Sequence, residues 1–195
     1  FVIEWTEDEL PKEYGAYSNL LMHFNGSKML AGLGAGVVLT SPTGDKVQCV
    51  LQILYTDSNN AAEYEALLHG LRMAASMGIQ RLEVRGDSIL AISQINGDFD
   101  AKDPKMAAYR NVILKMSTRF EGLEFHHVAR DSNQAADILA RMGAKRDPIL
   151  PTTFWKGFSS HLWYGKTGPE IPVRRRSHPR TPNTIWISSR AWALS

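Results

Sequence analysis

The stretch NNAAEYEALLHGLRMAASMG, residues 59–78, decides the fold class because the hydrophobic period of the chain changes there. Gly78 stands where the residue that ends a helix is expected. Apolar residues recur at positions i, i+3, i+4, i+7 and i+11, the spacing of one helix face: Tyr64, Leu67, Leu68, Leu71 and Ala75. The stretch therefore predicts a long helix with one apolar face.

Three apolar segments precede this helix and predict strands over 20–24, 33–39 and 47–55. Polar turn signals follow the first two segments, at 25–27 (NGS) and at 41–44 (SPTG). Glycine, proline and asparagine favour the backbone conformations of tight turns. Because short turns join strands that run in opposite directions, these segments predict an antiparallel meander.

The segments after the helix alternate between strand and helix. A meander followed by such crossover units produces a mixed sheet with helices on its faces. The residues therefore predict an α/β fold. We expect strands over 81–85 and 123–128, helices over 88–95, 106–120 and 132–142, and a loop over 97–105.

Both ends of the chain differ in composition from the middle. Residues 1–19 are rich in acids and have no sustained period, which is typical of an acidic linker. Residues 147–195 are basic and rich in Pro and Arg, so we expect a disordered or loosely attached tail. An out-of-frame or read-through product is the alternative for this tail. The folded domain is expected over 20–146, and the initial Phe, in place of Met, suggests a fragment or a piece of a longer polyprotein.

The overall composition is that of an ordinary soluble protein, with a formal net charge of +2. Residues 148–195 hold seven Lys and Arg against one acid, whereas the body is mildly acidic. No apolar run approaches the roughly 18 residues of a membrane span, and no signal-peptide pattern occurs. The single cysteine, Cys49, forms no internal disulfide and favours a reducing compartment. We expect an intracellular monomer, cytoplasmic or nuclear, with no membrane partner.

Oxygen-bearing side chains stand at several predicted element boundaries. Asn25 ends the first strand and Asp87 the fourth, so both emerge at one sheet edge if those strands are neighbours. Glu63 lies in the first turn of the first long helix, and Asp137 near the start of the last. Clustered carboxylates repel one another, and a hard divalent cation neutralises them. Each residue alone has a structural alternative, such as a turn former or a helix-start acid, but together they favour a site.

Four segments resemble, in order and spacing, the four motifs of ribonuclease H: HFNGS (23–27), NNAAEYEALLHGL (59–71), RGDS (85–88) and DSNQAAD (131–137). Over about residues 18–145, the chain is similar to the ribonuclease H domain of plant gypsy-type LTR retrotransposon polyproteins. The acidic linker is similar to the segment that joins such a domain to its reverse transcriptase. The resemblance therefore implies a reverse transcriptase domain in cis as a partner.

The resemblance also implies a ribonuclease H-like fold, with a five-stranded mixed sheet of order 3-2-1-4-5 flanked by helices. It implies two Mg²⁺ ions, with Mn²⁺ as an alternative, in a site that hydrolyses the RNA strand of RNA–DNA hybrids. Glu63, Asp87 and Asp137 match three of the family's four catalytic, metal-binding acids. Asn25 falls at the fourth position, where an aspartate normally bridges both ions.

This departure at Asn25 has a calculable cost. One unit charge removed about 4 Å from a cation weakens the attraction by about 4 kcal/mol at an effective dielectric of 20. We therefore expect activity lower by orders of magnitude in the chain as encoded. The alternatives are an inactive hybrid-binding module and a degenerate retroelement remnant. A further hypothesis is deamidation of Asn25, because Gly26 leaves the following backbone nitrogen unhindered.

The resemblance assigns four more residues to nucleic-acid binding. Asn59 and Asn60 match positions that reach both strands in the minor groove, and Ser88 matches a backbone-contacting position. Arg130 stands nearest to the place of a mobile histidine in many family members and is a candidate for phosphate contact. The structural alternative for the two asparagines is to cap the first long helix.

Overall fold

The computed structural model describes residues 12–17, 19–147 and 153–158 of the chain. The helices of these ranges are η2 (Lys12–Ala16), α1 (Asn59–Ser76), α2 (Ile89–Asn96), α3 (Pro104–Ser117), η3 (Arg130–Asn133) and α4 (Gln134–Lys145), where η marks a 3-10 helix. The strands are β1 (Leu20–Met29), β2 (Gly32–Thr40), β3 (Lys46–Ile53), β4 (Arg81–Gly86), β5 (Gly122–His127) and β6 (Thr153–Phe158). Among the described residues, no helix combines the length and the hydropathy that crossing a bilayer requires.

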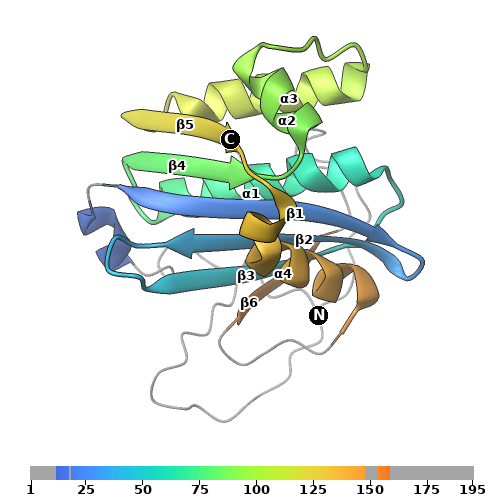
Figure 1. Cartoon of the computed structure of the whole chain (residues 1–195), viewed down its shortest axis with the longest axis horizontal. Helices are drawn as coiled ribbons and strands as arrows, with labels where there is room; N and C mark the ends of the chain where they lie inside the picture. Colours follow the sequence, from blue (N-terminus) through green and yellow to red (C-terminus); the bar gives the residue numbers. More distant parts are fainter. Residues whose placement is uncertain (1–11, 18, 148–152, 159–195) are drawn as a thin grey trace.

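The strands form one mixed sheet of order β5-β4-β1-β2-β3-β6 (Figure 1). The strands β1, β2 and β3 are antiparallel neighbours, as the meander predicted. The strand β4 pairs parallel to β1, and β5 pairs parallel to β4. The order 3-2-1-4-5 that the resemblance implies is therefore confirmed, and β6 extends it by one strand.

The strand β6 corrects one expectation, because we predicted no regular structure after Arg146. It pairs parallel with β3, from Gln48–Thr153 to Ile53–Phe158. Without it, β3 would present a row of unpaired N–H and C=O groups at the edge of the sheet, and a short extended segment satisfies them. Residues 1–11, 148–152 and 159–195 of the predicted linker and tail lie outside the described residues.

The turn predicted at residues 25–27 is wrong, because this segment lies inside the ten-residue strand β1. Asn25 pairs with Gly36 of β2, and the hairpin turns later, at residues 30–31. Gly26 serves a close approach instead of a turn. A Cβ atom there would lie 2.3 Å from the backbone nitrogen of Glu63, so only glycine lets the start of α1 cross β1 at this point.

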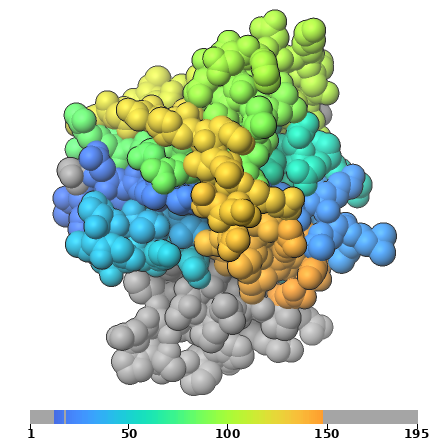
Figure 2. Space-filling model, in the orientation of Figure 1, coloured from blue at the N-terminus to red at the C-terminus, as the bar shows by residue number. Residues whose placement is uncertain are grey.

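Helices cover both faces of the sheet. One face packs against α1, with α2 and α3 beside it, and the buried side chains there include Met22 and Phe24 of β1. The helix α4 lies on the opposite face, over β1, β2 and β3 (Figure 1). There Leu139 packs against Val38 and Val50. In the space-filling view, the orange segment that contains α4 stands on the front face of the molecule (Figure 2).

The ends of α1 explain the observed length of this helix. The hydroxyl of Ser58 accepts a hydrogen bond from the backbone N–H of Ala61, so Ser58 is the N-cap, and the asparagines expected to cap are the first helical residues. At the other end, Gly78 adopts a φ of 77°, a left-handed conformation that ends the helix. The predicted stop at Gly78 is confirmed.

Candidate functional site

Asn25 and Asp87 lie at one edge of the sheet. The parallel pairing of β1 with β4 ends at the pair Phe24–Gly86, and Asn25 and Asp87 are the next residues of the two segments. This arrangement confirms that the first and fourth strands are neighbours. The carboxyl ends of parallel strands are where open α/β sheets commonly bind ligands.

Glu63 and Asp137 reach this edge from helices on opposite faces of the sheet. Glu63 is the fifth residue of α1, one residue beyond the first turn in which we predicted it. The backbone N–H of Gly26 donates a hydrogen bond to its carboxylate. Asp137 lies in the first turn of α4 and accepts a hydrogen bond from the side-chain amide of Asn25. We call Asn25, Glu63, Asp87 and Asp137 together the edge site.

The carboxyl group of Glu63 is the most perturbed of the edge site. The residue is only 5% exposed, and its Oε2 atom is buried without a hydrogen-bond partner. Burial raises the pKa of Glu63 to about 8, and the negative charges of Asp87 and Asp137 add to the increase. The Gly26 N–H and the positive charge of Arg130 oppose this rise in pKa. A buried acceptor without a donor is costly, and a bound ion or water is the usual explanation.

Asp137 is surrounded by donors from the chain itself. Its Oδ1 atom accepts from Nδ2 of Asn25 at 2.9 Å, and its Oδ2 atom lies 2.9 Å from Nε of Arg141. Arg130, with a side chain 69% exposed, places Nη2 3.6 Å from the same carboxylate. Asp137 is thus held between a neutral amide and two guanidinium groups.

Two residues of this arrangement were missed by the sequence reasoning. Asn133, which is 1% exposed, donates from Nδ2 to the Phe24 carbonyl at 2.9 Å and to Oδ1 of Asp87 at 3.0 Å. Its position within the motif DSNQAAD was the available signal. Arg141 follows Asp137 by four residues, a spacing at which side chains on a helix meet, and this was the second signal.

The four residues expected to bind nucleic acid lie in two places, beside the edge site and at the start of α1. Asn59 and Asn60 are exposed at the start of α1, and Oδ1 of Asn59 accepts from the backbone N–H of Lys28. Ser88 follows Asp87 directly, and its hydroxyl caps α2 by accepting from the N–H of Ala91. Arg130 lies beside Asp137. The structure therefore places all four near the sheet edge or the start of α1.

The oxygen atoms of the edge site are ligands of the type that a hard cation prefers, but there are fewer carboxylates than a complete metal site needs. Within the described residues, no group of three or more His, Cys, Asp or Glu side chains is arranged to hold a metal ion. The orphaned Oε2 of Glu63 and the nearby Asp87 are the carboxylates that fit such an ion best. Mg²⁺ is commonly bound by one or two carboxylates together with waters.

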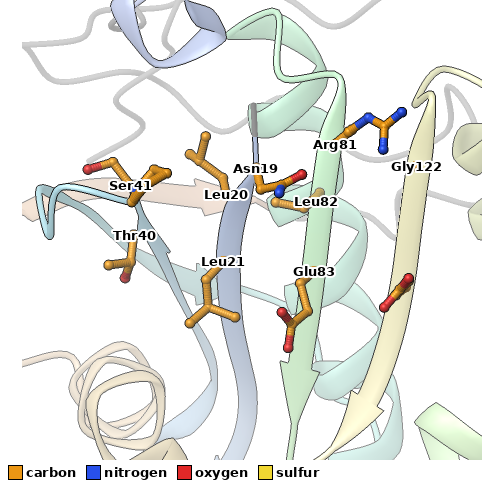
Figure 3. A pocket seen from close by; sticks show the side chains of 11 residues that line it. Asn19, Leu20, Leu21, Thr40, Ser41, Arg81, Leu82, Glu83 and Gly122 are labelled. Atoms are coloured by element: carbon orange, nitrogen blue, oxygen red, sulfur yellow. The ribbon is translucent and has the colours of Figure 1, made fainter. Parts of the chain in front are cut away.

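A hollow of about 450 Å³ lies at the opposite end of the strands (Figure 3). It is bordered by the first residues of β1, β4 and β5, including Leu20, Arg81 and Gly122, and by the end of β2. Glu83 and Leu21 also border it in Figure 3. None of the edge-site residues lines this hollow, and it lies at the amino ends of the parallel strands, away from the usual ligand edge.

Comparison with known proteins connects this geometry to a family. The sequence profile described as reverse transcriptase-like matches residues 23–143, a span that contains the whole edge site. The chain belongs to the reverse transcriptase-like family. The matched residues include all four motifs that resemble ribonuclease H, from HFNGS (23–27) to DSNQAAD (131–137).

Proteins similar to this reverse transcriptase-like chain include ribonucleases H. Ribonuclease HI of Halobacterium salinarum is 37% identical over 105 residues, 54% of this chain and 53% of that protein. The chain therefore spans about half the length of this curated relative. The crystal structure of RNase H1 from Halobacterium salinarum NRC-1 has a TM-score of 0.60 and 30% identity, covering 66% of this chain and 98% of that one.

A second similar structure is a complex with a nucleic acid. LC11-RNase H1 in complex with an RNA/DNA hybrid has a TM-score of 0.57 and 26% identity, over 65% of this chain and 97% of that one. The described part of this family member therefore has the ribonuclease H-like fold and is an RNase H-type domain.

Proposed function

We propose that this domain binds RNA–DNA hybrids and hydrolyses their RNA strand with a divalent cation, at a rate strongly reduced by Asn25. The observation that carries the proposal is the meeting of Asn25, Glu63, Asp87 and Asp137 at one sheet edge of an RNase H-type domain. Fold alone does not specify activity, so the proposal depends on this arrangement of side chains.

The edge site supplies the groups that such hydrolysis needs. A divalent cation would lower the pKa of a bound water and stabilise the leaving oxygen. Glu63 and Asp87 would hold it, while Asn133 fixes Asp87 through the hydrogen bond at 3.0 Å. The family's arrangement of two Mg²⁺ ions, or two Mn²⁺ ions, requires an aspartate at position 25, where this chain has Asn25.

The residues around the edge site suit a hybrid substrate. Hybrids are read through backbone shape and 2′-hydroxyls, which are contacted by small polar side chains and by cations. Asn59 and Asn60 are exposed for minor-groove contact, and Arg130 presents a guanidinium beside Asp137. Ser88 adds a hydroxyl next to Asp87. Because the body of the chain is mildly acidic, we expect weak, salt-sensitive binding by this domain alone.

A second candidate function is hybrid binding without cleavage. The observation that favours it is the neutral amide of Asn25, 4% exposed, which donates to Asp137 where the family has a shared negative charge. Both functions use the same surface, so they differ only in whether RNA is cut. A cleavage rate above the background of an Asp87→Asn variant separates them.

The finer context of the domain is also a proposal. The gypsy-type motifs support its origin in an LTR retrotransposon polyprotein, with a reverse transcriptase domain in cis that would hold the substrate. We propose a monomeric unit that acts inside the cell, in the cytoplasm or nucleus, where such hybrids would be made.

The proposed function is tested with a labelled RNA–DNA hybrid and the full chain. We expect a gel shift that weakens with salt, and slow RNA cleavage that requires Mg²⁺ and disappears in Asp87→Asn. A matched duplex DNA should remain uncut. Asp98→Asn, which changes an exposed aspartate in the loop after α2, is the control and should behave as the wild-type chain does. Equal affinity for hybrid and duplex DNA, with no RNA cleavage at any Mg²⁺ concentration, would exclude this function.

A further inference from the structure

The two aspartates of the edge site have different partners. Both oxygens of Asp137 are occupied by donors from the chain, Nδ2 of Asn25 on one side and Nε of Arg141 on the other, each at 2.9 Å. Asp87 instead accepts from the neutral amide of Asn133. Within the described residues, no lysine or arginine forms an ion pair with Asp87 or Glu63. The ion pairs of the site, from Arg141 and Arg130, are thus both made with Asp137.

The other half of the site contains the unsatisfied oxygens. Oε2 of Glu63 is buried without a hydrogen-bond partner, on a side chain that is 5% exposed. Oδ1 of Asn133, on a side chain 1% exposed, also lacks one. A hard cation that binds to a protein exchanges some of its water ligands for oxygen atoms, and buried oxygen atoms without donors are suited to this role. Asn133 is hydrogen-bonded to Asp87, and the charge of Asp87 acts on Glu63 more strongly than that of Asp137 does.

We propose that this chain binds one divalent cation, through Glu63 and Asp87, and that Arg141 and Asn25 hold Asp137 out of the coordination shell. The inference rests on the proposed function for its choice of ligand. It makes Arg141 a positioning residue that acts through Asp137. The guanidinium takes the place of the positive charge that a second ion would supply.

Charge balance supports a single ion. The ionised carboxylates of Glu63 and Asp87 match one dication, while Asp137 already faces two guanidinium groups, Arg141 at 2.9 Å and Arg130 at 3.6 Å. A second dication would have to displace Arg141 and would face the neutral Asn25 where the family has a bridging carboxylate. Two dications about 4 Å apart repel strongly unless such a shared anion lies between them. The chain therefore has the charges for one ion and lacks those for two.

The number of bound ions is measured directly on the full chain. Mn²⁺ titration followed by electron paramagnetic resonance counts the free ion, and calorimetry with Mg²⁺ gives the affinity without any activity readout. We expect one ion per chain. Two bound ions, or none up to millimolar concentrations, would overturn the inference without the need for any variant.

Variants then identify which carboxylates hold the ion. Asp87→Asn should weaken Mn²⁺ binding by about tenfold or more, because it removes one charge next to the cation. Asp137→Asn should change the affinity less than about threefold, and Asp98→Asn not at all. Equal losses for Asp137→Asn and Asp87→Asn would overturn the inference. Thermal melts of each variant, recorded with a chelator, show that the comparison is made on folded chains.

Arg141 is tested by creating the second ion site. The double variant Asn25→Asp/Arg141→Gln should bind two Mn²⁺ ions, whereas Arg141→Gln alone should still bind one. A double variant that keeps a single ion would show that Arg141 and Asn25 do not limit the number of ions. The failure of this inference is distinguishable from the failure of the proposed function: a chain that binds one ion but neither binds nor cuts hybrid would disprove the function alone.

Discussion

Two glutamates of the same helix, Glu63 and Glu65, are both buried but have different surroundings. Glu65 is 0% exposed, and its Oε1 atom accepts from the hydroxyls of Tyr55 and Tyr109, at 2.8 and 2.7 Å. Glu63 accepts from the backbone of Gly26 and has a buried oxygen with no donor. The Oε2 atom of Glu65 also lies 3.9 Å from Nε2 of His69. The contrast therefore separates a carboxyl group held by side chains of the fold from one held only by a backbone N–H.

The largest effect on stability is expected from Glu65→Leu. This change removes the acceptor of two tyrosine hydroxyls, and each buried donor left without a partner costs about 1–3 kcal/mol. We expect the free energy of unfolding to fall by about 3 kcal/mol, measured by urea denaturation with a chelator present. The matched control is Glu63→Leu, on the same helix. A Glu65→Leu chain as stable as the control would show that the two glutamates do not differ in this way.

A smaller loss is expected from Tyr109→Phe, which removes one donor to Glu65 and keeps the ring. Tyr109 is fully buried and stacks on Tyr64 with a centroid distance of 5.2 Å, a contact that phenylalanine preserves. Urea denaturation should show a loss of about 1–1.5 kcal/mol. Tyr17→Phe, whose hydroxyl contacts Thr43 at an exposed position, is the control and should be near neutral. Identical losses for both variants would contradict a structural role for Glu65.

The smallest effect on stability is expected from Glu63→Leu, within about 1 kcal/mol of the wild type at pH 5. At this pH the wild-type residue is largely protonated, because its pKa in the fold is about 8. Leucine then replaces a neutral carboxylic acid that has a buried oxygen without a hydrogen-bond donor. A loss of several kcal/mol in Glu63→Leu would mean that Glu63, like Glu65, is a structural residue.

The same pair of chains tests the pH dependence. The unfolded chain releases the Glu63 proton near the ordinary pKa of 4.5, whereas the folded chain keeps it to about 8. The folded state therefore binds more protons between these values, and wild-type stability falls as pH rises through this window. Denaturation at pH 5, 7 and 9 with a chelator should show this fall in the wild type and a weaker one in Glu63→Leu. Parallel pH profiles would show that Glu63 ionises normally in the fold.

Much of the fold was predictable because it is determined by short-range patterns. The helix face from Tyr64 to Ala75 and the stop at Gly78 follow from helical spacing and from glycine's backbone freedom. The prediction of a turn at residues 25–27 was wrong because composition does not distinguish a glycine in a turn from a glycine that allows a neighbouring backbone segment to approach closely. Gly26 is the second kind, and only the packing of α1 on β1 reveals it.

The edge site was predictable in its members but not in its connections. The strand ends placed Asn25 and Asp87 together once β1 and β4 were taken as neighbours. The hydrogen bonds of Asn133 and the ion pair of Arg141 depend on how η3 and α4 pack over the sheet. Side-chain direction at that level is set by tertiary packing, which a single sequence does not contain. The unequal environments of Asp87 and Asp137 are therefore a finding of the structure.

The central claim, that the edge site is a nuclease site limited by the amide of Asn25, is tested most directly by the cleavage rate of Asn25→Asp. The rate of RNA hydrolysis in an RNA–DNA hybrid with Mg²⁺ is measured for the wild type, for Asn25→Asp and for Asn25→Asp/Asp87→Asn. We predict an increase of about a hundredfold or more in the single variant, because a restored charge strengthens cation binding by up to about 4 kcal/mol. The double variant should return to background. Equal rates in the wild type and Asn25→Asp would contradict the claim.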